Sequence, residues 1–244
     1  LKAKIGLSIV NTILEIRLLK AYDLIIKNRY ETLKEVVYSV GINSRPYFNK
    51  KFESRFGIKP GELRKKYKNL RAGISPTKAS DLSLVLANSS LQIPIWDFFY
   101  YHIFLSIEDK NEVDTLPLIT LFQGKDKNVV VPKVIGRNTL ENYLLTDTTA
   151  LKKSAWGVPE PVEGIKVPEN KIGVVFVPLL AFDAMGNRVG YGKGFYDGFL
   201  NKCRKETLKI GLSFFAAEPE LISDIHENDV KLDYCVTPEK VYTF

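Results

Sequence analysis

The sequence predicts an α/β domain, with a mostly parallel sheet flanked by helices, preceded by a small all-α domain of helix-turn-helix type. Apolar runs of strand length recur at residues 100–105, 128–134, 172–177 and 208–213, and helical periodicity falls between them. A strand, a helix and a second strand in this order pair in parallel through a right-handed crossover. Residues 1–60 instead show only helical patterns, so we place the domain boundary between residues 60 and 61.

Three helices are expected in residues 1–60. The first spans apolar positions from Val10 to Ile25, and the second begins at Glu31 or Thr32 and ends at Gly41. A third helix follows, capped by Asn43 or Ser44, with Pro46 tolerated in its first turn. The expected inward positions are Leu33, Val36, Val37 and Val40 on the second helix, and Phe48, Phe52 and Phe56 on the third. Two short helices around a glycine-containing turn, the second one basic outside, form a helix-turn-helix.

The basic charge of the chain is concentrated in this N-terminal unit. Residues 1–59 hold 12 Lys and Arg against 5 Asp and Glu, a net charge of +7, which equals that of all 244 residues. A basic segment of this kind predicts a polyanionic partner, with nucleic acid first among the candidates. Arg45, Asn49 and Lys50 on the third helix are the candidate DNA-binding residues. The alternative is a basic helical appendage that binds no specific sequence.

The amino-acid composition narrows the classes of protein to which the chain can belong. An apolar content of 45% and a charged content of 26% are ordinary for a globular protein. Cys203 and Cys235 lie far apart and form no Cys-x-x-Cys motif, so we expect neither a disulfide nor a zinc site, but the reduced thiols of a cytoplasmic protein. No apolar run approaches the roughly 18 residues of a membrane span, and the start lacks signal-peptide architecture, so no membrane partner is expected.

The stretch from Arg188 to Asp197 is the strongest candidate for a binding site. Its glycines alternate with other residues over 190–194, between a buried strand and the first turn of a helix. Glycine lets backbone N–H groups approach an oxyanion closely, and a helix start adds its positive dipole end. Arg188 and Lys193 add two cations, and Asp197 adds a carboxylate suited to Mg²⁺. The pattern predicts a phosphate-binding loop, with a plain flexible turn as the alternative.

The same stretch carries a family resemblance. Residues 178–183 read Pro-Leu-Leu-Ala-Phe-Asp, residues 186–188 read Gly-Asn-Arg, and residues 190–197 read Gly-Tyr-Gly-Lys-Gly-Phe-Tyr-Asp. Together they resemble the signature of 5-formyltetrahydrofolate cyclo-ligase, also called methenyltetrahydrofolate synthetase, over about residues 60–244. The family usually has Tyr-Tyr-Asp where this chain has Phe195-Tyr196-Asp197, a mild departure if the ring does the packing.

The resemblance implies an ATP- and Mg²⁺-dependent ligase that closes 5-formyltetrahydrofolate to 5,10-methenyltetrahydrofolate and releases ADP and phosphate. Phosphoryl transfer needs positioning and charge neutralisation more than a protein nucleophile. The catalytic residues would be Lys193, Arg188 and Tyr196, and Asp197 with Asp233 would hold Mg²⁺. The implied ATP contacts are Lys59, Arg64, Arg188, Gly190, Tyr191, Gly192, Lys193, Gly194, Phe195 and Asp197. The family places a phosphate-contacting Lys where this chain has Pro60, with Lys59 displaced by one position.

The resemblance also implies folate contacts at Glu112, Trp156 and Tyr196. Glu112 lies in residues 110–115, Lys-Asn-Glu-Val-Asp-Thr, and Trp156 opens residues 156–161, Trp-Gly-Val-Pro-Glu-Pro, both similar to family segments. Taken alone, Glu112 would be a first-turn carboxylate serving a helix dipole, and Trp156 a structural corner. His102, within a buried strand, is expected to be a satisfied core residue.

A second resemblance covers the N-terminal unit. Residues 33–42, 47–52 and 56–60 are similar to the second helix-turn-helix of AraC-type transcription regulators, which implies a DNA partner through residues 1–60. The body of that family's first unit and any effector-binding domain are absent from this chain. Three interpretations stay open: an active ligase with a remnant DNA-binding unit, a regulator whose former enzyme domain senses folate or nucleotide without turnover, and a mis-joined or truncated product in which only the C-terminal part folds well. The nearly complete set of site residues favours the ligase.

Overall fold

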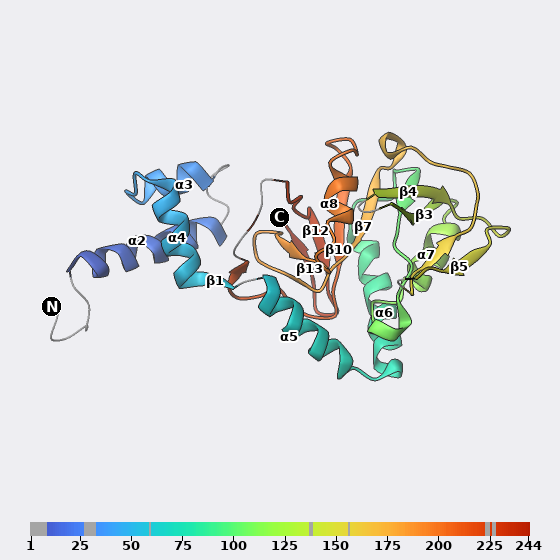
Figure 1. Ribbon diagram of the computed structural model, residues 1–244, viewed down its shortest axis with the longest axis horizontal. Coiled ribbons are helices and arrows are strands. Elements are labelled where there is room, and N and C mark those ends of the chain that lie inside the picture. The colour runs from blue at the N-terminus through green and yellow to red at the C-terminus, as the bar shows by residue number, and fades with distance from the viewer. Residues whose placement is uncertain are drawn as a thin grey trace.

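The computed structural model describes residues 9–26, 33–58, 60–136, 139–155, 157–222, 225 and 228–244, and its elements fall into two units (Figure 1). A bundle of three helices lies at one end, and a larger α/β unit follows it. Long helix α5, Pro60–Ala72, opens the larger unit and packs against its short β8–β9 hairpin. The expected succession of an all-α part and an α/β part is confirmed.

The N-terminal bundle contains the three expected helices. They are α2 (Ile9–Ile26), α3 (Leu33–Ser39) and α4 (Arg45–Phe56). Gly41, at φ 78°, follows α3, and the Ser44 hydroxyl caps α4 by accepting from the Tyr47 amide at 3.3 Å. The expected starting residues of the second helix, Glu31 and Thr32, lie outside the described residues.

The core of this bundle is aromatic. The rings of Phe48 and Phe52 lie 5.0 Å apart, those of Phe52 and Phe56 lie 4.8 Å apart, and all three side chains are buried. Val36 and Val37 of α3, and Val40 just after it, are buried beside them, as the helical spacing predicts, while the side chain of Leu33 lies outside the described atoms. Burial of several such side chains, each contributing about 1.5–3 kcal/mol, holds these short helices together.

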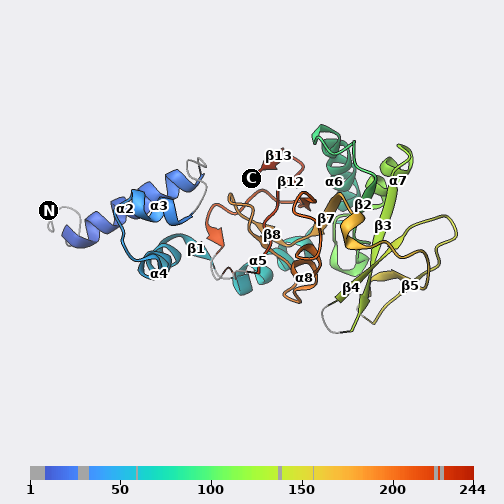
Figure 2. The same cartoon turned by 90° about the horizontal axis from the view of Figure 1, so that it is seen from above.

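The bundle is attached to the α/β unit at several points. Strand β1 (Gly57–Ile58) pairs in parallel with β11 (Leu221–Ile222), and the Tyr22 hydroxyl donates to the Pro219 carbonyl at 2.5 Å. Leu221 is buried within the phenylalanine cluster of the bundle. Figure 2 shows β1 at the junction between the two units. The sequence did not predict this junction, because a two-residue strand has no periodicity to detect.

The described residues of the α/β unit form a seven-stranded sheet in the order β13-β12-β10-β7-β2-β3-β4. The strands from β12 to β3 are parallel, whereas β13 and β4 pair antiparallel at the two edges. The expectation of a mostly parallel sheet is therefore confirmed. The strands of the sheet are β2 (Tyr100–His102), β3 (Asn128–Ile135), β4 (Thr139–Leu144), β7 (Val174–Pro178), β10 (Leu208–Leu212), β12 (Tyr234–Val236) and β13 (Val241–Thr243).

Shorter elements surround the sheet. The further helices are α6 (Pro76–Ser89), α7 (Leu116–Gln123) and α8 (Phe195–Leu200), with 3₁₀ turns at Ser90–Gln92, Glu108–Lys110 and Glu169–Lys171. Two hairpins complete the unit, β5 (Leu151–Lys153) with β6 (Pro159–Pro161) and β8 (Ala181–Phe182) with β9 (Arg188–Val189). None of the described helices is long and apolar enough to cross a membrane. Cys203 and Cys235 are both free.

Helices cover both faces of the sheet. On one face, Tyr101 and Phe176 pack with Phe122 of α7, and on the other, Val175 packs in the cluster that contains Phe199 of α8. Strand alternation therefore turns His102 toward α8, where its ring lies 4.6 Å from that of Phe199. His102 is fully buried, but neither ring nitrogen makes a hydrogen bond with the described residues, which corrects the expectation of a satisfied core histidine.

Candidate functional site

A cavity of about 560 Å³ opens beside the glycine loop. Its walls come from loops that follow β2 and β7, from α5, from β3, β4 and β6, and from the segment after β11. Both β2 and β7 are parallel strands, and ligands of open α/β sheets bind at the carboxyl ends of such strands. The lining residues named in the predictions are Arg64, Glu112, Arg188, Gly190, Tyr191, Gly192, Lys193, Gly194, Phe195, Tyr196 and Asp197.

The glycine loop presents open backbone to the cavity. Gly192 and Gly194 have φ values of 86° and 69°, which side-chain-bearing residues rarely adopt. A Cβ atom added at Gly190 or Gly194 would meet nothing within 4 Å. Gly194 precedes the six-residue helix α8 and gives it no side-chain cap. The loop therefore leaves room for a ligand to approach its backbone closely.

Arg64 of α5 lies against the glycine loop. Its Nε donates to the Gly190 carbonyl at 3.0 Å, and a Cβ on Gly192 would lie 3.1 Å from the guanidinium carbon. Lys68, one helical turn further along α5, also lines the cavity. Lys193 contributes an exposed cation from the loop itself. The loop is thus surrounded by positive charge, as an oxyanion requires.

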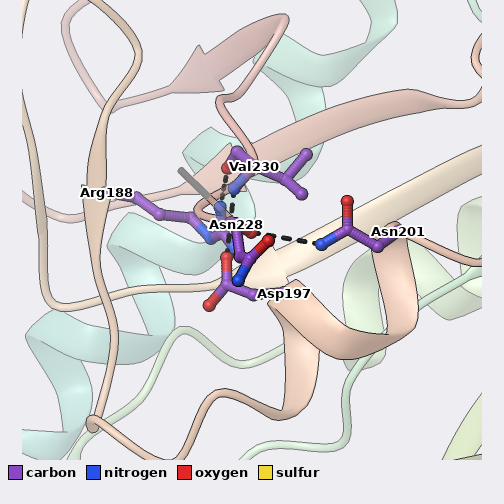
Figure 3. Close-up of polar contacts among 5 residues, drawn as sticks. All are labelled: Arg188, Asp197, Asn201, Asn228 and Val230. Atoms are coloured by element: carbon purple, nitrogen blue, oxygen red, sulfur yellow. Dashed lines mark hydrogen bonds and ion pairs between the residues drawn. The ribbon is translucent and has the colours of Figure 1, made fainter. Parts of the chain in front are cut away.

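Arg188 and Asp197 form an ion pair in the cavity wall (Figure 3). The Arg188 Nη2 lies 2.6 Å from Asp197 Oδ1, and the Arg188 side chain is only 6% exposed. The same carboxylate oxygen accepts from the Val230 amide at 3.2 Å, while Arg188 Nη1 donates to the Val230 carbonyl. Asp197 Oδ2 makes no hydrogen bond with the described residues. Arg188 therefore fixes Asp197 and the Val230 backbone, and leaves one carboxylate oxygen for a ligand.

Glu112 lies in the segment after β2, which forms one end of the cavity. It is 8% exposed, and its Oε2 accepts from the Ile107 amide at 2.8 Å. Helix α7 begins at Leu116, so Glu112 belongs to the preceding loop and not to a first helical turn. Burial raises the pKa of the Tyr191 phenol, and the nearby Glu112 carboxylate adds to the rise.

Tyr196 has an unsatisfied hydroxyl. Its ring contacts His102 and Phe199 edge-on, and its buried hydroxyl has no hydrogen-bond partner among the described residues. Burial, with Glu112 as a second cause, raises the pKa of this phenol. Tyr196 therefore stays protonated at neutral pH and can donate a hydrogen bond to a ligand.

Asp233, one of the two predicted Mg²⁺ ligands, lies elsewhere. It does not line the cavity, and its Oδ2 instead accepts from the Lys209 amide at 2.7 Å and pairs with Lys209 Nζ at 3.0 Å. The physical reason is topological: Asp233 directly precedes β12, which places it at the amino end of a parallel strand, away from the edge where ligands bind. Asp229, four residues earlier, lines the cavity and was not predicted.

Two predicted residues, Lys59 and Trp156, lie outside the described residues. Within the described part of the chain, no cluster of three or more His, Cys, Asp or Glu side chains is arranged for a metal ion. Besides Asp229, the sequence also did not predict Lys68 and Glu160 as lining residues. Glu160 stands in the segment that resembles the family's folate-pocket border, which was the only signal for it.

The candidate DNA-binding residues lie on α4. Arg45 and Lys50 are exposed, whereas the Asn49 side chain lies outside the described atoms. Arg55, also exposed, pairs with Glu15 of α2 at 2.7 Å, so part of its charge is neutralised within the bundle.

A mixed, mainly parallel sheet with an open glycine loop beside a cationic cavity defines an α/β protein built to bind an anionic ligand. The 5-formyltetrahydrofolate cyclo-ligase family model matches residues 59–238. The chain belongs to the 5-formyltetrahydrofolate cyclo-ligase family. A helix-turn-helix domain model matches residues 1–66, so the two matches share residues 59–66.

Relatives and solved structures agree with this assignment. The chain is 34% identical over 146 residues to a probable 5-formyltetrahydrofolate cyclo-ligase of Schizosaccharomyces pombe, covering 54% of this chain and 72% of that protein. It is 31% identical over 148 residues to the 5-formyltetrahydrofolate cyclo-ligase of Escherichia coli K12, covering 57% and 78%. The structure of Aquifex aeolicus 5,10-methenyltetrahydrofolate synthetase superposes with a TM-score of 0.61 at 30% identity, covering 75% of this chain and 92% of that one.

Proposed function

We propose that this chain catalyses the ATP-dependent closure of 5-formyltetrahydrofolate to 5,10-methenyltetrahydrofolate. The observation that carries the proposal is the single cavity that joins the glycine loop, Arg64 and Lys193 to the Glu112 end. Such a cavity has one region suited to phosphates and another suited to a flat organic ring. The activity named for the Schizosaccharomyces and Escherichia relatives supports the same reaction.

The reaction balances without a covalent protein intermediate. The γ-phosphoryl group of ATP passes to the formyl oxygen and ADP is released. N10 of the folate then attacks the activated formyl carbon, and the phosphate leaves that carbon with the formyl oxygen and takes up the N10 proton. The protein's share is to position the two substrates and to stabilise the charge that develops between them.

Each charged residue has a distinct task in this proposal. The amides of residues 190–194 cradle the terminal phosphates, with Arg64 held beneath the loop by its bond to the Gly190 carbonyl. Lys193 stabilises the phosphoryl group in transfer, and the protonated Tyr196 hydroxyl donates to the folate. Arg188 acts on Asp197 through their ion pair, and we assign it a positioning role.

The donor set also fits Mg²⁺. Mg²⁺ prefers oxygen ligands and is often held by one or two carboxylates together with substrate phosphates. Asp197 and Asp229 both line the cavity, and Asp197 retains an oxygen without a hydrogen-bond partner among the described residues. We propose that these two carboxylates hold the ion, which would supply charge neutralisation at the phosphates.

One assay tests the proposed activity. Purified protein with Mg-ATP and 5-formyltetrahydrofolate should produce the absorbance of the methenyl product. Lys193→Ala should lower kcat by about 10²- to 10³-fold, as for other preorganised donors. Lys202→Ala, an exposed lysine just beyond α8, is the matched control and should leave kcat unchanged. Full turnover by the Lys193 variant would refute its role. Binding of both ligands without any product would instead favour the folate- or nucleotide-sensing regulator.

We also propose that the N-terminal unit binds DNA through α4. The exposed Arg45 and Lys50 and the helix-turn-helix match over residues 1–66 support this role. In gel-shift titrations over a salt series, the logarithm of the affinity should fall linearly with the logarithm of salt concentration. Lys50→Ala should reduce that slope by about 1 if the lysine contacts a phosphate, whereas Lys78→Ala on α6 should not change it. An unaltered slope for Lys50→Ala would show that α4 does not face the DNA backbone.

A further inference from the structure

Glu160 is a buried acidic residue of the cavity to which the predictions gave no role. It is the central residue of β6, it lines the cavity, and it is only 9% exposed. Its Oε1 atom is buried and accepts no hydrogen bond from the described residues. Among the buried side-chain atoms that have no hydrogen-bond partner in the described residues, Glu160 Oε1 is the one carboxylate oxygen.

A buried carboxylate oxygen without a donor is costly. Water no longer solvates it, and nothing in the protein replaces that solvation, so such atoms are rare in folded proteins. Glu112, another buried carboxylate of the cavity lining, shows the usual arrangement, because one of its oxygens accepts from the Ile107 amide at 2.8 Å. Glu160 therefore has a hydrogen-bonding capacity that a ligand can fill.

The surroundings of Glu160 indicate the kind of ligand. Val158 lines the cavity on the same segment, and Gly157 approaches Ile107, with its Cβ position 3.9 Å from Ile107 Cγ2. Pro132 and Val134 of β3 add further apolar wall. A cavity wall that combines these apolar side chains with a buried carboxylate suits a flat heterocycle that carries adjacent N–H donors at one edge.

The pterin ring of a reduced folate has such an edge, with its 2-amino group next to N3–H. Both donors point the same way, so one carboxylate can accept from both, as in other bidentate pairs. We propose that Glu160 is a specificity-determining residue that accepts hydrogen bonds from the 2-amino and N3–H edge of the substrate's pterin ring. This inference rests on the proposed folate substrate. It places the pterin end of that substrate at the β6 side of the cavity.

Equilibrium binding of 5-formyltetrahydrofolate to the full chain tests the inference. Glu160→Gln keeps the shape and removes the charge, and it should weaken substrate binding by about 10- to 100-fold, as for the loss of a charge-assisted hydrogen bond. The affinity for ATP should not change. Glu163→Gln, an exposed glutamate three residues further on, is the matched control and should leave both affinities unchanged.

A substrate analogue separates recognition from a structural effect. With a methyl group in place of the 2-amino group, Glu160→Gln should lose less affinity relative to wild type than it does with the substrate, because one of the two donors that Glu160 recognises is gone. The thermal unfolding midpoint of Glu160→Gln without ligand should equal or exceed that of wild type, because the variant removes an unpaired buried charge.

Three results would overturn the inference. They are equal substrate affinity of Glu160→Gln and wild type, an equal loss for substrate and analogue, and a lowered unfolding midpoint, which would indicate a partner within the protein. If wild type itself does not bind 5-formyltetrahydrofolate, the proposed function fails and this inference with it. Normal substrate binding by wild type together with any of the three results would overturn the role of Glu160 alone.

Discussion

Replacing Arg188 by Met removes the buried cation that holds Asp197 and the Val230 backbone together. Arg188 pairs with Asp197 at 2.6 Å and also donates to the Val230 carbonyl. Removing one partner of a fully buried pair costs about 3–5 kcal/mol. The Asp197 side chain is 29% exposed, so water would solvate part of the orphaned carboxylate. We therefore expect Arg188→Met to lower the free energy of unfolding by about 2–3 kcal/mol, less than for a fully buried pair.

The corresponding shift in midpoint is measurable. With an unfolding entropy of about 2.1 cal/mol/K per residue, a loss of 2–3 kcal/mol lowers the thermal midpoint of a chain of this length by about 4–6 °C. Urea and thermal unfolding followed by tryptophan fluorescence report on the α/β unit, because Trp96 and Trp156 both belong to residues 60–244. Arg204→Met changes an exposed arginine and should stay within about 0.5 kcal/mol of wild type.

A double-mutant cycle isolates the pair. Asp197→Asn removes the carboxylate charge, so Arg188→Met should cost less in that background, with a coupling energy of about 1–3 kcal/mol. A coupling energy near zero, or an Arg188 variant as stable as wild type, would show that the ion pair does not hold this wall of the cavity.

Two further predictions follow from backbone strain and from burial. Gly192→Ala places a Cβ 3.1 Å from the Arg64 guanidinium carbon at a φ of 86°, so it should weaken ATP binding in an equilibrium titration. Gly136→Ala, at a φ of 62° with no atom near its Cβ, should cost a similar 1–2 kcal/mol of strain but leave ATP affinity unchanged. Equal ATP affinities for both variants would contradict the role of the loop. Burial lowers the pKa of His102 to about 3, so the unfolded chain binds a proton near pH 6.5 that the folded chain does not. The histidine contribution to stability is therefore complete above pH 6.5 and is lost as pH falls toward 3, by about 2 kcal/mol between pH 6.5 and 5. His102→Phe should lack this part of the pH dependence in urea unfolding, and identical pH profiles would show that His102 reaches solvent.

The sequence was sufficient for the features that depend on local pattern. Helical spacing identified α2, α3 and α4 and their phenylalanine core, and apolar runs identified the parallel strands of the sheet. The glycine stretch and the family resemblance predicted that Arg64, Glu112 and residues 188–197 belong to one site, and these residues line one cavity. Each of these features is encoded within a few consecutive turns or strands.

Features that depend on three-dimensional juxtaposition were not predicted. Asp233 and Asp229 are both aspartates near β12, and only the strand direction shows that the first lies at the amino end of the strand and the second beside the cavity. The ion pair between Arg188 and Asp197 joins two predicted site residues, and no spacing rule indicates that they are in contact. The unpaired oxygen of Glu160 becomes apparent only once burial is known.

The parallel pairing of β1 with β11 has a consequence for protein engineering. Leu221 completes the core of the helical bundle, while its neighbour Ile222 lines the cavity and donates to the buried Asp183 carboxylate at 2.9 Å. Truncation before Pro60 would expose the Leu221 side chain to solvent. It would also leave the backbone of β11 without its β1 hydrogen-bond partners. The helical bundle therefore cannot be removed without exposing apolar surface. A truncated enzyme would need a polar residue in place of Leu221 to avoid aggregation.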